Sequence, residues 1–186
     1  STDNPGSQNS LPSYYFSGAN EPYYLNTAAG TAYAAMDATD VRKTSLSVKA
    51  GNYYISKFPD FVTHSNYSPV IRYAEVLLNR AEALVRAGNS VTQESVDLLN
   101  AVRTRSFATG GYTLASFATA ADFYTAILTE RNMEFLGEGM RNLDLMRLGL
   151  TIPGKDGGSM GNISSVSPTS PTYIWPISAL ELTFNK

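Results

Sequence analysis

Three glutamates at four-residue intervals, Glu130, Glu134 and Glu138, are the clearest candidates for acid–base chemistry in this sequence. Neighbouring helical positions bring Cβ atoms within about 5–6 Å, a spacing that suits the paired carboxylates of a glycoside hydrolase. Like charges this close repel each other unless cations lie between them. The available cations are Arg103, Arg105, Arg131 and Arg141. A helix body is a poor place to expose an acid and a base to a sugar. We therefore expect an ion-pair network, with hydrolysis by Glu130 and Glu134 as the less favoured alternative.

Tyrosines are the second set of candidates, and they gather in the first third of the chain. Residues 1–44 contain Tyr14, Tyr15, Tyr23 and Tyr24 among frequent Pro and Gly residues, which indicate loops and turns. An aromatic ring covers the apolar face of a sugar while its phenol reaches a hydrogen-bond partner. We predict that these four tyrosines bind a ligand. The alternative is that the rings only hold irregular loops against the core.

Several other chemistries lack the residues they need. His64 is the single histidine and there is no cysteine, which excludes a histidine-based triad and thiolate or multi-histidine metal sites within this sequence. Asp37 with Asp40, or Asp156 with Gly157, could contact calcium, but neither follows the alternating acidic pattern of a calcium loop. A net charge of −2 gives no reason to expect nucleic-acid binding. We predict no catalytic residue, no metal and no cofactor.

Helical periodicity is strongest over residues 69–88. Apolar residues recur there at three- and four-residue steps, which predicts one buried face made of Val70, Tyr73, Ala74, Leu77, Ala81, Leu84 and Val85. Pro69 suits a first helical position and Gly88 suits the residue that follows a last turn. Glu82 and Arg86 have the order of a stabilising i,i+4 pair.

Further elements follow in a regular order. Residues 93–106 predict a helix with Thr92 as its N-cap and an inward row of Val96, Leu99 and Val102. Two more helices are expected at about 120–136 and 140–148, separated by Gly137 and Gly139. Residues 46–49 and 53–56 predict a small β-hairpin that turns at a Gly51-Asn52 pair.

The predicted fold is mainly α, with tetratricopeptide-like helix pairs, long irregular loops and a small β-hairpin. We divide the chain into a loop-rich aromatic segment (1–68), two helical pairs (69–150) and a Gly/Ser-rich loop with an extended end (151–186), within one domain. Stacked helical repeats are normally stable only from about three units upward. We therefore expect the chain to be a fragment of a longer protein. No run of residues approaches the apolar length of a membrane span.

Four blocks of this sequence, taken together, resemble the C-terminal part of the SusD/RagB family. They are VIRYAEVLLNRAEAL, LLNAVRTRS, ILTERNMEFLGEGMRNLDLMRLG and, before Asn185, WPISALEL. The blocks follow the order of the family and cover about half of the chain. Asp40-Val41-Arg42 and Tyr54-Ile55-Ser56-Lys57 resemble weaker family landmarks. Because these blocks are mainly architectural in the family, no ligand-binding residue carries over through them.

The resemblance implies a non-catalytic glycan- or nutrient-binding lipoprotein at the surface of the bacterial outer membrane. Its partner would be a SusC-like TonB-dependent transporter. It would meet the membrane only through an N-terminal lipid anchor, which these residues do not contain. A different function that the helix pairs alone would allow is a helical-repeat scaffold that binds a peptide or a protein.

Overall fold

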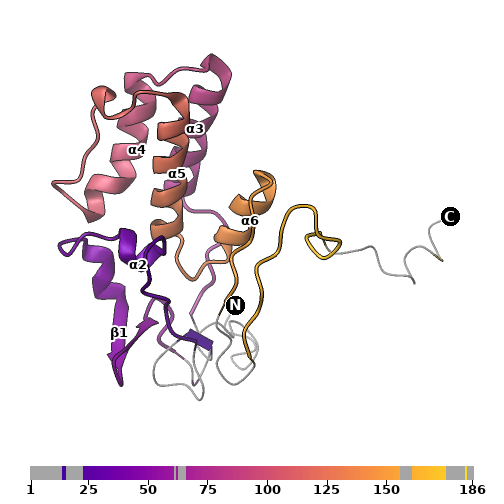
Figure 1. Cartoon of the computed structure of the whole chain (residues 1–186). Helices are drawn as coiled ribbons and strands as arrows, with labels where there is room; N and C mark the ends of the chain where they lie inside the picture. Colours follow the sequence, from indigo (N-terminus) through magenta and orange to yellow (C-terminus); the bar gives the residue numbers. More distant parts are fainter. Residues whose placement is uncertain are drawn as a thin grey trace. The chain divides into compact units, whose positions relative to one another are not determined.

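Three helices form the centre of the first of two compact units, which spans residues 1–140. In the computed structural model, α3 (Tyr73–Gly88), α4 (Gln93–Ser106) and α5 (Ala120–Glu134) lie side by side (Figure 1). The structure describes residues 14–15, 23–60, 62, 66–155, 161–174 and 183. The expectations for His64, for Asp156 and for an extended segment around Trp175 fall outside these residues. The second unit, residues 141–186, is described separately below.

The core of the bundle comes from one stripe on each helix. α4 contributes the predicted row of Val96, Leu99 and Val102, all essentially inaccessible to solvent. α3 and α5 pack against it with Ala74, Leu78, Ala81, Val85, Phe123 and Ile127. The mainly helical fold predicted from the sequence is confirmed.

α4 and α5 begin where the sequence indicates. Thr92 caps α4 by accepting a hydrogen bond from the Ser95 backbone N–H, and Ser95 Oγ accepts one from the Thr92 N–H. Thr119 and Asp122 form the same reciprocal arrangement at the start of α5. These bonds satisfy backbone donors that a helix start leaves without an intrahelical partner.

The prediction for the first helix is wrong at its start and in part of its face. α3 begins at Tyr73 and not at Pro69, because Arg72 has an extended backbone (φ −117°, ψ 151°). Gly88 is the last helical residue, and Asn89 takes the left-handed position (φ 47°) instead. Leu78 and Glu82 are buried, whereas Tyr73 is exposed. α3 carries more than one apolar stripe, and periodicity alone does not say which stripe faces α4 and α5.

A β-hairpin and two short helical turns precede the bundle in sequence. β1 (Leu46–Lys49) and β2 (Asn52–Ile55) pair antiparallel, with Leu46 opposite Ile55 and Lys49 opposite Asn52. The hairpin prediction is confirmed, but its turn residues are Ala50 and Gly51, one position earlier than expected. α2 (Ala32–Ala35) and the 3₁₀ helix η2 (Val41–Ser45) lead into β1.

We expect Ala50→Asn to stabilise the protein. Ala50 has φ 51° and Gly51 has φ 81°, the signs that a two-residue hairpin turn of type I′ requires. Asparagine tolerates the left-handed conformation better than alanine. The free energy of unfolding should rise by about 0.5–1 kcal/mol, as measured by urea denaturation. Gly51→Ala should lower it, and a stabilising Gly51→Ala would contradict this account of the turn.

The second unit begins within α6 (Met140–Arg147). Its following segment, predicted as a loop, contains two antiparallel bridges, Ile152 with Val166 and Lys155 with Ile163. The Tyr173 hydroxyl donates hydrogen bonds to the Leu145 and Leu150 carbonyl oxygens, at 3.1 and 2.8 Å. These contacts hold the described part of the segment against the end of α6.

Candidate functional site

The tyrosines predicted to bind a ligand lie in two groups near the hairpin. The Tyr23 N–H donates to the Tyr14 carbonyl at 2.6 Å, and the two rings stack with centroids 6.2 Å apart and planes 20° apart. Tyr14 is 50% exposed and Tyr23 is 44% exposed. The structure therefore brings together two residues that are nine positions apart in sequence, with much of each ring open to solvent.

Tyr24 belongs to the second group. The next residue, Leu25, donates its N–H to the Tyr53 carbonyl at 2.7 Å, so this segment is bonded to β2 at that point. The Tyr24 ring meets the buried Tyr54 edge-on, with centroids 6.3 Å apart. Tyr24 remains 48% exposed. The hairpin therefore positions Tyr24 through one backbone bond and one ring contact.

Tyr15 is less accessible than the other three predicted residues. Burial, together with the nearby Tyr23, raises the pKa of the Tyr15 phenol above its ordinary value. The phenol therefore stays protonated at neutral pH and keeps its hydrogen available for donation. Tyr15 is better placed to support the Tyr14–Tyr23 pair than to serve as an open aromatic face.

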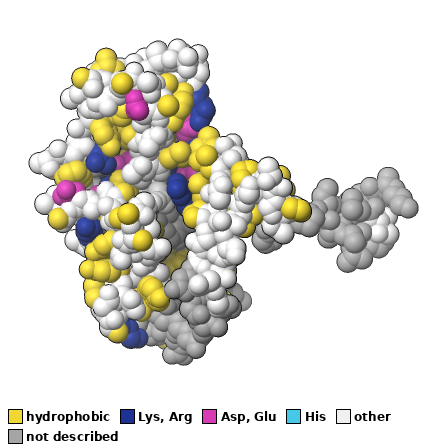
Figure 2. Space-filling view, in the orientation of Figure 1, with side chains coloured by type: hydrophobic (Ala, Val, Ile, Leu, Met, Phe, Trp, Pro, Cys, Tyr) yellow, Lys and Arg dark blue, Asp and Glu magenta, His cyan; other side chains and the backbone are white. Residues whose placement is uncertain are grey.

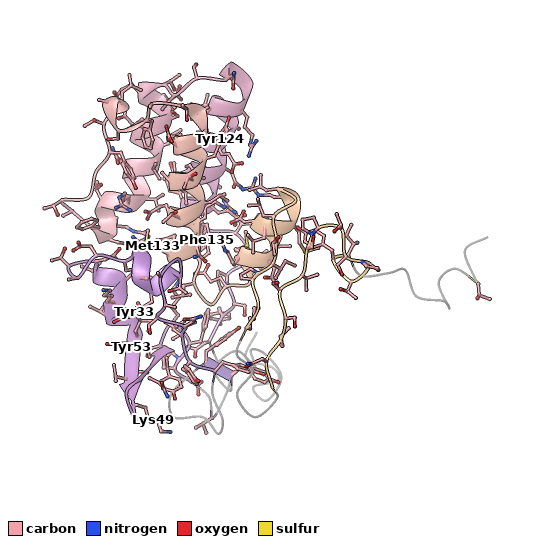
Figure 3. The ribbon with its side chains drawn as sticks, viewed as in Figure 1. Tyr33, Lys49, Tyr53, Tyr124, Met133 and Phe135 are labelled. Carbon is pink, nitrogen blue, oxygen red and sulfur yellow. The ribbon has the colours of Figure 1, made fainter. Side chains whose placement is uncertain are left out.

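Tyr33 and Tyr53 form a third aromatic pair that the sequence analysis did not single out. Their rings lie 4.5 Å apart, and the Lys43 ammonium lies 5.0 Å from the centre of the Tyr33 ring. The hydrogen bond with Tyr53 is the main cause of a raised Tyr33 pKa. Figure 3 shows the pair beside the hairpin. Tyr53 and Tyr54 are neighbours in β2, so their side chains leave opposite faces of the hairpin.

We call the half-exposed rings of Tyr14, Tyr23 and Tyr24 the aromatic surface, which lies near the hairpin. In Figure 2 hydrophobic side chains appear at several places on the viewed face, including the end that holds β1 in Figure 1. A separate hollow of about 310 Å³ lies between the α3–α4 loop and the start of α5, where Asn89, Val91, Phe117 and Thr119 are among its lining residues. That hollow contains no tyrosine, so it is distinct from the aromatic surface.

The three glutamates form an ion-pair network. Glu130 is completely buried and accepts hydrogen bonds from Arg42 at 2.6 Å and from Arg103 at 2.9 Å. Glu134 accepts from Arg72 at 2.8 Å and from Arg105 at 2.6 Å. These contacts agree with the ion-pair interpretation of the sequence.

Two cations bind the third glutamate. Glu138 accepts from Lys57 at 2.8 Å and from Arg72 Nε at 2.9 Å. Arg42, Lys57 and Arg72 were not among the predicted cations, whereas the predicted Arg131 donates to Asn79 at 2.6 Å. Arg42 precedes the hairpin and Lys57 follows it, so the network also fixes both ends of the hairpin on the α5 segment. We use the name buried charge network for the three glutamates and the cations that contact them, namely Glu130, Glu134, Glu138, Arg42, Lys57, Arg72, Arg103 and Arg105.

The state of Glu134 does not suit a general acid. Burial alone would raise the pKa of Glu134, but Arg105 and Arg72 outweigh burial and lower the pKa below the usual value of 4.5. A general acid at neutral pH needs a raised pKa. Glu134 is therefore ionised and engaged by arginine, as a structural carboxylate would be.

Lowering the pH should lower the free energy of unfolding through protonation of Glu134. The Glu134 pKa is lower in the folded state than the unfolded value near 4.5, so its stabilising contribution is complete above about pH 4.5 and is lost as the pH falls toward the folded pKa. We expect the urea midpoint to fall between about pH 5 and pH 3, and to fall less in Glu134→Gln. The Asp40 pKa is also lowered, so part of the dependence remains. An identical decline in the variant would contradict this assignment.

A protein-family model, described as SusD family, matches residues 12–186 of the sequence. That range covers nearly the whole chain. The chain belongs to the SusD family. No match is found among curated protein sequences.

Solved structures of the SusD superfamily support the same assignment. One from Bacteroides fragilis is 32% identical, with a TM-score of 0.73, and the match covers 93% of this chain but 39% of that protein. Others from Bacteroides vulgatus and Bacteroides thetaiotaomicron are 26% and 25% identical, with TM-scores of 0.60 and 0.58. Each of these two matches covers 80% of this chain and about a third of the other protein, 34% and 36%. The chain thus spans well under half of these SusD-superfamily proteins.

Two further observations limit the chemistry of this SusD-family chain within its described residues. No group of three or more histidine, aspartate or glutamate side chains there is arranged to hold a metal ion. Of the helices described, none has both the length and the apolar character needed to cross a membrane.

Proposed function

We propose that this chain supplies a non-catalytic glycan-binding surface of a nutrient-uptake protein. The stacked and half-exposed pair of Tyr14 and Tyr23 carries the proposal. Nearly parallel rings offer similarly oriented aromatic faces, which suit the apolar face of a sugar ring. Tyr24 extends the aromatic area beside the hairpin, and Tyr15 offers a protonated phenol for a hydroxyl of the ligand.

Membership of the SusD family supports the cellular setting of this proposal. The complete protein would act at the outer surface of the bacterial outer membrane and deliver an oligosaccharide to a SusC-like TonB-dependent transporter. The buried charge network supports a role in binding without catalysis, because it ties the glutamates to cations in the interior. A hydrolytic role for Glu130 would require a sugar to reach a side chain that has no exposed surface.

The test begins with a glycan array and continues with affinity gels that contain the polysaccharide retained best. We expect Tyr14→Ala and Tyr23→Ala each to weaken retention by about tenfold, because each removes one ring of the stacked pair. Tyr15→Phe should weaken it by a few fold through loss of one hydroxyl donor.

A matched control is Tyr124→Ala. This tyrosine lies on α5, apart from Tyr33 and Tyr53 in Figure 3, and packs beneath Arg86. Its replacement should leave retention unchanged. Failure of every glycan to bind the wild-type chain, or equal retention by Tyr14→Ala and Tyr23→Ala, would refute the proposed function.

A further inference from the structure

A partly buried lysine beside the hairpin has no carboxylate partner among the residues that the structure describes. The Lys43 ammonium lies 5.0 Å from the centre of the Tyr33 ring, and it forms no hydrogen bond or ion pair within those residues. Lys57 is different, because it donates to the Glu138 carboxylate and to the Glu134 carbonyl, both at 2.8 Å. An ammonium carries three N–H donors. The donors of Lys43 are therefore available to an acceptor on a ligand.

The hairpin adds aromatic and aliphatic side chains beside this lysine. The Tyr33 and Tyr53 rings lie 4.5 Å apart with planes 42° apart, and both are partly exposed. Val48 lies directly opposite Tyr53 in the β1–β2 register, so the two share one face of the hairpin. Val48 is 63% exposed. We call Tyr33, Lys43, Val48 and Tyr53 the Lys43 face. It combines a cation with surface that suits the C–H groups of a sugar.

The carboxylates closest to Lys43 in sequence already have other partners. Asp37 Oδ1 accepts hydrogen bonds from the Thr39 N–H and Oγ1, at 2.8 and 2.7 Å. These bonds are the main cause of a lowered Asp37 pKa, to which the positive charge of Lys43 contributes less. Asp40 is buried and paired with Arg42. Lys43 thus keeps its charge available for an anion from outside the chain.

We propose that the Lys43 face binds a sugar that carries a carboxylate, such as a uronic acid. The Lys43 ammonium pairs with that carboxylate, while Tyr53 and Val48 contact the apolar side of the sugar ring. A hydrogen bond between two charged groups is about twice as strong as a neutral one, so the cation favours acidic over neutral sugars. This inference rests on the proposed function, because it treats the chain as a glycan binder. It uses different side chains, however, since Tyr24 contacts Tyr54 on the opposite face of the hairpin.

Matched acidic and neutral probes test this inference. Oligogalacturonate and oligoglucuronate would each be compared with the corresponding methyl ester, which loses the charge and keeps the sugar ring. Calorimetry on the 186-residue chain measures the affinities. We expect at least one acid to bind about tenfold more tightly than its ester. The preference should fall below about threefold in 1 M NaCl, where charges are screened within about 3 Å.

Variants at one position separate charge from packing. Lys43→Gln should remove the preference for the acid, and Lys43→Arg should keep it, because arginine retains the positive charge. Lys155→Gln is the matched control, since it removes the same charge from an exposed lysine of the second unit. The control should leave both affinities unchanged. Circular dichroism would show that each variant is folded.

Several results would overturn the inference. These are failure of both acids to bind, equal affinity for acids and esters, and a preference that survives Lys43→Gln or is lost in Lys155→Gln. Polyglutamate bound as tightly as the acidic sugars would show attraction of acidic polymers in general. If neutral glycans bind through Tyr14 and Tyr23 while the acids gain nothing, only this inference fails. If the acids bind through Lys43 while Tyr14→Ala and Tyr23→Ala change no affinity, only the proposed role of the aromatic surface fails.

Discussion

Glu130→Ala is expected to lower the free energy of unfolding by about 3–5 kcal/mol. The substitution removes the carboxylate that the largely buried Arg103 contacts, whereas Arg42 loses one of its carboxylate partners and keeps Asp40. An uncompensated buried charge costs far more than the net value of the ion pair itself. Urea denaturation at neutral pH measures the change. We also expect the hairpin to loosen first, because Arg42 links the residues before β1 to α5.

An exposed ion pair in the same protein provides the matched control. Arg80 and Glu94 also contact each other through their charged groups, but both side chains are more than half exposed. Glu94→Ala should change the free energy of unfolding by less than about 1 kcal/mol. If Glu130→Ala and Glu94→Ala had similar effects, burial of the network would not be the reason for its contribution.

Gly137→Ala is expected to lower the free energy of unfolding by about 2–5 kcal/mol. Gly137 has φ +80°, a conformation that costs an L-residue about 1–2 kcal/mol. An added Cβ would also lie 2.9 Å from Ile55 Cδ1, and Ile55 is a buried residue of β2. Either the isoleucine or the connection after α5 must move, and overpacking of this kind costs about 1–3 kcal/mol.

Gly139 separates these two causes. It has the same φ of +80°, but an added Cβ would meet no atom within 4 Å. Gly139→Ala should therefore cost only the conformational part, about 1–2 kcal/mol. Thermal melts of the two variants give the comparison. Equal losses would mean that the contact with Ile55 adds nothing, and an undiminished melting temperature in both would refute the backbone argument.

These effects bear on recognition because the same contacts position the hairpin. Arg42 and Lys57 attach its two ends to glutamates of the α5 segment, and Gly137 allows Ile55 to pack closely. Leu25, two residues after Tyr23, in turn donates its N–H to the Tyr53 carbonyl of β2. Glycan retention by Glu130→Ala should therefore fall along with stability, whereas Tyr14→Ala should reduce retention with little change in unfolding.

Local sequence signals determined much of the fold. Thr92 marks the start of α4 as its N-cap. α4 has a single row of apolar residues, so the sequence already indicates which face of this helix is buried. Left-handed Gly137 and Gly139 separate α5 from α6 as expected. The hairpin was located correctly to within one residue at its turn. The sequence blocks also indicated the family, because their order and spacing can be compared without knowing which residues are in contact.

Tertiary structure alone decided three matters. It selected which apolar stripe of α3 enters the core, because a helix with two such stripes has no local preference between them. It paired Glu130 with Arg42, 88 residues away, and Glu134 with Arg72, 62 residues away. It also brought Tyr14 against Tyr23 and Tyr33 against Tyr53. Helical periodicity and capping act over a few residues, whereas contacts between distant side chains depend on how the whole chain closes on itself.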